Sequence, residues 1–192
     1  MESNIYGALD FVIMPQYLHA DPKRKITENT LEYFMQSSAP SWVKALFIFL
    51  YYFGVRITEA LSTHSTDVEV IDDMVHVTVV TLKNKSQDTR RLWIPVTAPY
   101  VDYFLSYTRD RAGLKLWEYS RQWSRVKLQE VYPWITPHGF RHNRLDDFAQ
   151  NDFTPFALKS WAGWSDVRPS ETYTQAYDTR KMADKMWRKK SG

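Results

Sequence analysis

The sequence lacks several features that would point to particular classes of protein. It has no cysteine, which excludes disulfides, thiolate nucleophiles and cysteine-ligated zinc, so the default expectation is an intracellular protein. Its longest apolar run, residues 45–55, is about half of the ~20 residues that cross a bilayer. The first twenty residues contain acids and no basic segment ahead of an apolar one. We therefore expect neither a membrane span nor a signal peptide.

Net charge is also small, at +3 over 192 residues, and this length suits one domain. Its distribution is more informative, because residues 1–100 contain 9 Lys and Arg against 11 Asp and Glu, whereas residues 101–192 contain 16 against 11. The basic residues of this second half alternate with tryptophans, an arrangement that suits a nucleic-acid backbone. A solvated helix face above a tryptophan-rich core explains the composition equally well.

Local patterns predict an α+β domain that is mainly α-helical with a small three-stranded antiparallel sheet. Alternating valines on both sides of Asp72-Asp73 predict a β-hairpin over residues 68–79, and residues 91–95 a third strand. Thr27, Ser41, Thr136 and Thr154 are placed to cap helices. The predicted helices are 28–35, 42–52, 56–61, 98–112, 116–131, 138–151, 155–162 and 169–177. Residues 1–25 are interpreted as a leader or linker, and 178–192 as a C-terminal tail.

Two candidate functional sites lie in the first half of the chain. Arg56 ends its most apolar segment, and a guanidinium there needs an anionic partner. Glu59, three residues on, is a structural partner for it, and a bound anion is the functional alternative. Lys83 and Lys85 lie in a polar turn before the third strand, where lysines are usually just solvated. A lysine at such a turn can also bind a phosphate and supply a proton.

The third candidate is the segment from Thr136 to His142. Thr136 and Pro137 place His138 in the first turn of a helix, whose free N–H groups favour an anion. Arg141 follows three residues later on the same face, so the segment suits phosphate. His138 and His142 have the spacing of a zinc pair, but Gly139 stands where the metalloprotease pattern requires Glu. We therefore expect no metal, and a structural histidine remains an alternative.

The fourth candidate is Ala162-Gly163-Trp164, with Tyr173 nine residues after the tryptophan. A single tyrosine among 12 is weak by itself, and core packing explains it as well. The order of the four candidates is more specific than any one of them. It resembles the motif series of the tyrosine recombinase, or phage-type integrase, family over roughly residues 25–177. Residues 54–61 resemble that family's Gly-Leu-Arg-Ile-Ser-Glu-Leu box, and Ala162-Gly163-Trp164 resembles the Cre-like variant of its Gly-His motif.

This resemblance implies a tyrosine recombinase catalytic-domain fold over residues 26–177. It implies DNA strand cleavage and rejoining through a 3′-phosphotyrosyl intermediate, without metal, nucleotide or other cofactor. The implied catalytic residues are Arg56, Lys83 (with Lys85 in reserve), His138, Arg141, Trp164 and Tyr173. An indole cannot shuttle a proton as the family's histidine can, so Trp164 would only donate a hydrogen bond.

The resemblance also implies the partners and the place of action. Double-stranded DNA is the expected partner, bound by a homotetramer of the full-length protein, whereas this chain alone is expected to be a monomer. The tail after the nucleophile is expected to pack on a neighbouring protomer, and the alternative is that it packs on its own domain or is loose. The expected location is the cytoplasm or nucleoid, or a host cell if a virus or plasmid encodes the protein. Two alternatives stay open: a type IB topoisomerase-like enzyme that relaxes DNA, and a DNA-binding remnant that does not cleave.

Overall fold

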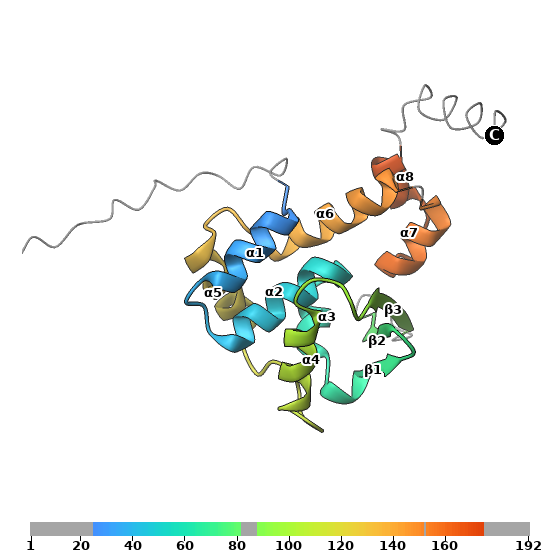
Figure 1. Ribbon diagram of the computed structural model, residues 1–192. Helices are drawn as coiled ribbons and strands as arrows, with labels where there is room; N and C mark the ends of the chain where they lie inside the picture. The colour runs from blue at the N-terminus through green and yellow to red at the C-terminus, as the bar shows by residue number, and fades with distance from the viewer. Residues whose placement is uncertain (1–24, 82–87, 152, 175–192) are drawn as a thin grey trace, which may run out of the picture.

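The computed structural model describes residues 25–81, 88–151 and 153–174 (Figure 1). Helices dominate these residues, and a short 3₁₀ turn at Ser65–Asp67 leads into the sheet. The helices are α1 (Glu28–Gln36), α2 (Ser41–Phe53), α3 (Ile57–Ser62), α4 (Val101–Arg109), α5 (Arg121–Val131), α6 (Pro137–Gln150), α7 (Pro155–Ala162) and α8 (Arg168–Thr174). The strands are β1 (Val68–Ile71), β2 (Met74–Val80) and β3 (Thr89–Pro95). Among the described helices, none is long and apolar enough to cross a bilayer.

Helix α2 lies at the centre of the main core, the larger of two hydrophobic clusters. All residues from Ala45 to Leu50 are fully buried, because α2 is apolar on every face and contacts helices on several sides. Helices α1, α4, α5 and α6 pack around it. Aromatic rings fill much of the space between them, including Phe34, Phe47, Phe104, Trp117 and Phe140.

The sheet is antiparallel with strand order β1-β2-β3. Val70 pairs with Val75 across the predicted turn, and Asp72 adopts a left-handed conformation there with φ 52°. The alternate residues Val75, Val77 and Val79 of β2 are buried in the main core, as their spacing predicts. Helix α3 contacts β2, and α7 contacts β3.

A second cluster is much smaller and joins helices α6, α7 and α8. Its buried residues are Leu145, Ala149, Leu158 and Ala162. Helix α6 belongs to both clusters, since Phe140 near its start packs in the main core and Leu145 in the second cluster. Figure 1 shows α7 and α8 at the far end of α6 from α1 and α5. Side chains on α6 can therefore contact both regions.

The fold class predicted from the sequence is correct, and the differences concern ends of helices. Ser41 is the first residue of α2, not its cap, because Pro40 occupies the cap position. Helix α4 begins only at Val101, since Tyr100 is left-handed at φ 62°. Helix α5 begins after Ser120, whose side chain accepts a hydrogen bond from the Trp123 amide. The predicted leader, apart from Lys25, and the predicted tail lie outside the described residues.

Candidate active site

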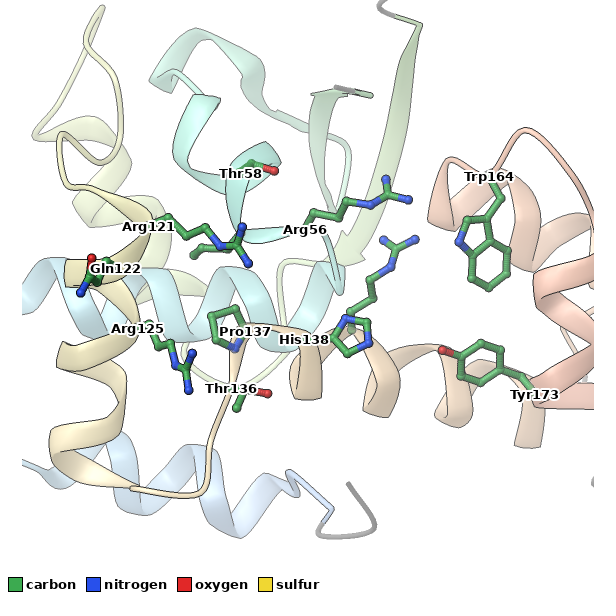
Figure 2. A pocket seen from close by; sticks show the side chains of 12 residues that line it. Arg56, Thr58, Arg121, Gln122, Arg125, Thr136, Pro137, His138, Trp164 and Tyr173 are labelled. Atoms are coloured by element: carbon green, nitrogen blue, oxygen red, sulfur yellow. The ribbon is translucent and has the colours of Figure 1, made fainter. Parts of the chain in front are cut away.

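A cavity of about 730 Å³ opens between α3, α5, α6 and the α7–α8 region. Side chains from distant parts of the chain line this cavity, as Figure 2 shows. Its lining contains four arginines and no carboxylate among the described residues. The lining residues are Arg56, Ile57, Thr58, Arg121, Gln122, Arg125, Thr136, Pro137, His138, Arg141, Trp164 and Tyr173. Such a pocket attracts anions.

Arg56 precedes α3 and is held by Glu59, as the three-residue spacing suggested. Its Nη1 lies 2.8 Å from Glu59 Oε1, and its backbone N–H donates to Oε2 at 3.0 Å. The Arg56 side chain is still 26% exposed, whereas that of Glu59 is fully buried. The guanidinium is therefore oriented by Glu59 and remains accessible from the pocket.

Arg90 on β3 is a second cation on the same carboxylate. Its Nη2 lies 2.7 Å from Glu59 Oε2, and its other nitrogens donate to the Thr81 hydroxyl and the Trp161 carbonyl, each at 2.9 Å. Burial raises the pKa of Glu59, but the hydrogen bonds and charges of Arg90 and Arg56 outweigh it and lower that pKa. Because Glu59 carries one charge against two arginines, the trio retains one positive charge.

Arg141 is 5% exposed and joins the two hydrophobic regions. It donates to the Gly54 carbonyl at 3.2 Å and to the Ala162 carbonyl at 2.7 Å, and it lies 5.7 Å from the centre of the Trp164 ring. No ion pair within the described residues includes Arg141. Burial, reinforced by the charge of Arg56, lowers its pKa to about 10, so it is charged at neutral pH. A buried cation held only by carbonyls is suited to an anionic ligand.

Two glycines lie in close contact with the side chains of Arg144 and Arg90. Gly54 ends α2 in a left-handed conformation, with φ 57°, and a Cβ there would lie 2.8 Å from Arg144 Cβ. Gly163 ends α7 with φ 63°, and a Cβ there would lie 2.7 Å from Arg90 Nη1. Side chains at either position would be strained and would displace an arginine. The structure thus explains why glycine occupies both of these motif positions.

His138 lies where the sequence predicts it, in the first turn of α6. Thr136 caps the helix by accepting a hydrogen bond from the Gly139 amide at 3.0 Å. Burial, followed by the charges of His142, Arg141 and Arg56, lowers the pKa of His138. The imidazole is therefore neutral at pH 7 and able to donate a hydrogen bond to an anion at the helix terminus.

Trp164 and Tyr173 reach the pocket from the second cluster. Their rings stack with centroids 5.9 Å apart. The Tyr173 hydroxyl forms a 2.9 Å hydrogen bond with His142 Nδ1. Burial raises the pKa of Tyr173, although Arg141 opposes the rise, so the phenol is protonated at neutral pH. Figure 2 shows this hydroxyl directed toward the α6 side of the pocket.

The pocket therefore brings together five of the six residues that the resemblance implies: Arg56, His138, Arg141, Trp164 and Tyr173. The sixth, Lys83, and its reserve Lys85 lie outside the described residues. The sequence motifs assign no role to Arg90 and connect His142 only with the spacing of a zinc pair. Arg121 and Arg125 belong to the basic second half of the chain and to none of the motifs. They are exposed on α5 and line the opposite side of the pocket (Figure 2).

Comparison with known protein families identifies the group to which this chain belongs. The model of the phage integrase family matches residues 17–180. The chain therefore belongs to the phage integrase family, the tyrosine recombinases that its ordered motifs resemble. Comparison with curated proteins gives no match.

Several solved structures share the fold. The XerH site-specific recombinase bound to its difH substrate, in a pre-cleavage complex, has a TM-score of 0.69 at 12% identity over 88% of this chain and 54% of that one. The Tn1549 transposon integrase in complex with transposon right end DNA has a TM-score of 0.61 at 16% identity, over 88% and 66%. The catalytic domain of bacteriophage HP1 integrase has a TM-score of 0.55 at 16% identity, over 79% and 86%. This chain spans about half the length of XerH.

Proposed function

We propose that this chain is the catalytic domain of a site-specific recombinase that cleaves and rejoins double-stranded DNA through a 3′-phosphotyrosyl intermediate. The main support is the convergence of Arg56, Arg141, His138, Trp164 and Tyr173 on one cationic pocket. DNA as the substrate is supported by family membership and by the complexes in which XerH and the Tn1549 integrase are found.

In the proposed reaction, the Tyr173 oxygen attacks a backbone phosphate and releases a 5′-hydroxyl. The pentacoordinate transition state carries two negative charges, which Arg56 and Arg141 neutralise with forked hydrogen bonds. His138 and the Trp164 indole donate further hydrogen bonds. Lys83 protonates the leaving oxygen; its assignment rests on the sequence alone. The covalent bond to Tyr173 conserves the phosphodiester energy, so rejoining needs no ATP.

Arg121 and Arg125 extend the same cationic surface beyond the phosphate that reacts. Their exposure suits neighbouring phosphates of the same DNA segment, and binding through them would weaken steeply with salt. We propose that the full-length protein acts as a homotetramer on DNA and that this chain alone is monomeric. Because its substrate is DNA, the enzyme would act inside a cell that carries its target.

The decisive experiment selects for covalent products, since the target site is unknown. The 192-residue chain is incubated with a pool of nicked duplexes of randomised sequence, and protein–DNA adducts that survive denaturing detergent are recovered and sequenced. We expect wild type to yield adducts on a restricted set of sequences and Tyr173→Phe to yield none. Absence of adducts from wild type contradicts the proposed function, and adducts from Tyr173→Phe contradict the choice of nucleophile.

The two other candidate functions give different results in the same preparation. A topoisomerase-like enzyme would relax supercoiled plasmids without any sequence requirement. A non-cleaving remnant would bind duplex DNA in a salt-dependent way and form no adduct. Relaxation and equilibrium binding therefore separate the three functions.

A further inference from the structure

Within the described residues, the hydroxyl of the proposed nucleophile is hydrogen-bonded to a residue that the family motifs do not assign. Tyr173 Oη and His142 Nδ1 are 2.9 Å apart, and their ring centroids are 5.6 Å apart. His138, the histidine that the motif does assign, forms no hydrogen bond to Tyr173 in the described structure. Its ring instead meets that of His142 edge to face, with centroids 4.5 Å apart. Among the described residues, His142 and not His138 is therefore the histidine that is hydrogen-bonded to the proposed nucleophile.

Helical spacing explains this division. His138 and His142 are one turn apart on the same face of α6. His138 therefore lies near the N-terminus of this helix, and His142 lies one turn closer to α8. The helix N-terminus and the positive charges of Arg56 and Arg141 favour an anion at His138. His142 is instead next to the hydroxyl that must lose its proton.

We propose that His142 is a catalytic residue that accepts the phenolic proton of Tyr173, while His138 holds the phosphate. This inference rests on the proposed function and deepens it. An imidazole that accepts at Nδ1 carries its own proton on Nε2. The arrangement of nucleophile and base within direct hydrogen-bond reach is the one that activates weak nucleophiles in other covalent catalysts.

The proposed step transfers a proton to His142 and exchanges one bond at phosphorus for another. The proton moves from Tyr173 Oη to His142 Nδ1, and an electron pair of the oxygen forms the bond to phosphorus. The bond from phosphorus to the 5′ oxygen breaks, and that oxygen keeps the electron pair and takes a proton from the acid of the proposed mechanism. In rejoining, the 5′-hydroxyl returns its proton to that acid and attacks phosphorus, the bond from phosphorus to Tyr173 Oη breaks, and His142 returns its proton to this oxygen.

The surroundings of the pair make a base necessary. Burial raises the pKa of Tyr173, Arg141 lowers it and Asp146 raises it, and the net result is a protonated phenol at neutral pH. Within the described residues, Arg141 and Asp146 on α6 are the charged groups that act on Tyr173, Lys25 pairs with Asp146 at 3.6 Å, and His138 contacts the His142 ring. Since Arg141 alone does not bring the phenol to ionisation, a proton acceptor in contact with it has a direct effect on the rate.

The first test needs no DNA. Proton–nitrogen correlation spectra of the five histidine rings report the tautomer and titration of each. We expect Tyr173→Phe to shift the ring-nitrogen resonances of His142, and to leave those of His64, next to the sheet, and His76, in β2, unchanged. If His142 is unaffected by Tyr173→Phe, the contact and the inference are both wrong.

The second test measures the single-turnover rate of adduct formation on a duplex recovered in the selection above. We expect His142→Ala to reduce this rate by about 10²–10⁴-fold at pH 7, the range of general base catalysis, and to steepen its rise with pH. His142→Asn places an amide near the position of Nδ1, so it retains a hydrogen bond but accepts no proton. We expect His142→Asn to remain as slow as His142→Ala within about tenfold.

The outcomes separate the inference from the proposed function. Wild-type adducts together with an unchanged rate and pH profile in His142→Ala overturn the inference and leave the recombinase intact. Full rescue by His142→Asn also overturns it, because only orientation would then be required. If wild type forms no adduct on any duplex, the proposed function fails and the catalytic role of His142 fails with it.

Discussion

The two hydrophobic regions differ in size and support different residues of the pocket. The main core surrounds α2 and supports Arg56 through Glu59, a carboxylate with no exposed side-chain surface. The second cluster has four buried residues and supports Trp164 and Tyr173, whose hydroxyl forms a partly exposed hydrogen bond. Few buried contacts usually mean a low free energy of local opening. Arg56 is therefore fixed by the large region, and the proposed nucleophile is carried by the region that is easier to rearrange.

Arg141 connects the two regions, and its removal is expected to have the largest effect. Arg141→Ala loses the donors to Gly54 and Ala162 as well as the charge for the phosphate. We expect the rate of adduct formation to fall by about 10³-fold or more, by analogy with other charge-stabilising groups. Arg141→Lys keeps the charge without the forked geometry and should recover only part of the rate.

Single-turnover adduct assays on the selected duplex measure both rates. Arg125→Ala is the matched control, because Arg125 lines the same pocket but is exposed on α5. It should weaken binding to DNA, with the largest fold-change at low salt, and change the rate at saturating DNA little. A loss of less than tenfold in Arg141→Ala would contradict the central role of this arginine.

Glu59 is the main support of the cations in the larger region. Glu59→Gln leaves two guanidiniums without their carboxylate, and breaking a buried ion pair by removing one partner costs about 3–5 kcal/mol. We expect the free energy of unfolding to fall by roughly that amount, measured by urea titration of tryptophan fluorescence. A change below about 1 kcal/mol would show that Arg56 and Arg90 are solvated well enough without Glu59.

The extent to which the sequence predicted this fold depends on how local each signal is. The hairpin over 68–79 and the Thr-Pro starts of α6 and α7 are confirmed, because strand alternation and helix capping act over a few residues. Helix α4 is shorter than predicted, since the left-handed Tyr100 has no sequence signal of its own.

For the candidate site as well, the sequence predicts motif residues but not the contacts between distant elements. Family motifs point to residues by order along the chain, and the structure brings five of them to one pocket. Contacts between distant elements were missed: Arg90 reaches Glu59 across 31 positions and Trp161 across 71, and His142 reaches Tyr173 across 31. No spacing rule covers such pairs, because helix packing and the sheet register determine them.

A pair of core truncations compares the two regions directly. Leu46 in the main core and Leu158 in the second cluster are both fully buried, and Leu→Ala in a core costs about 2–5 kcal/mol. We expect Leu46→Ala to reduce global stability by such an amount. Leu158→Ala should instead accelerate hydrogen exchange in α7 and α8 and reduce global stability less. Equal effects of both variants on exchange in α2 would contradict a separate second region.

The pH dependence of stability tests the ion pairs of Glu59 more finely. Its pKa is lower in the folded chain than its ordinary value of 4.5, so these pairs stabilise the fold above that pH. The contribution is lost as the pH falls toward the folded pKa. The difference in unfolding free energy between wild type and Glu59→Gln should therefore be constant from pH 7 to 5 and shrink below about 4.5. A difference that does not shrink in acid would contradict the lowered pKa.

The smallest effect is expected at the two helix caps. Thr136 accepts a hydrogen bond from the Gly139 amide, and Thr154 accepts one from the Ala157 amide. Each Thr→Ala change should cost about 1 kcal/mol of stability in thermal unfolding. Their effects on function should differ, because α6 presents His138 to the pocket and α7 does not supply a pocket residue. Thr136→Ala should slow adduct formation several-fold, whereas Thr154→Ala should leave the rate of adduct formation at saturating DNA within about twofold. The reverse order would show that the second cluster, not the start of α6, controls the geometry of the phosphate site.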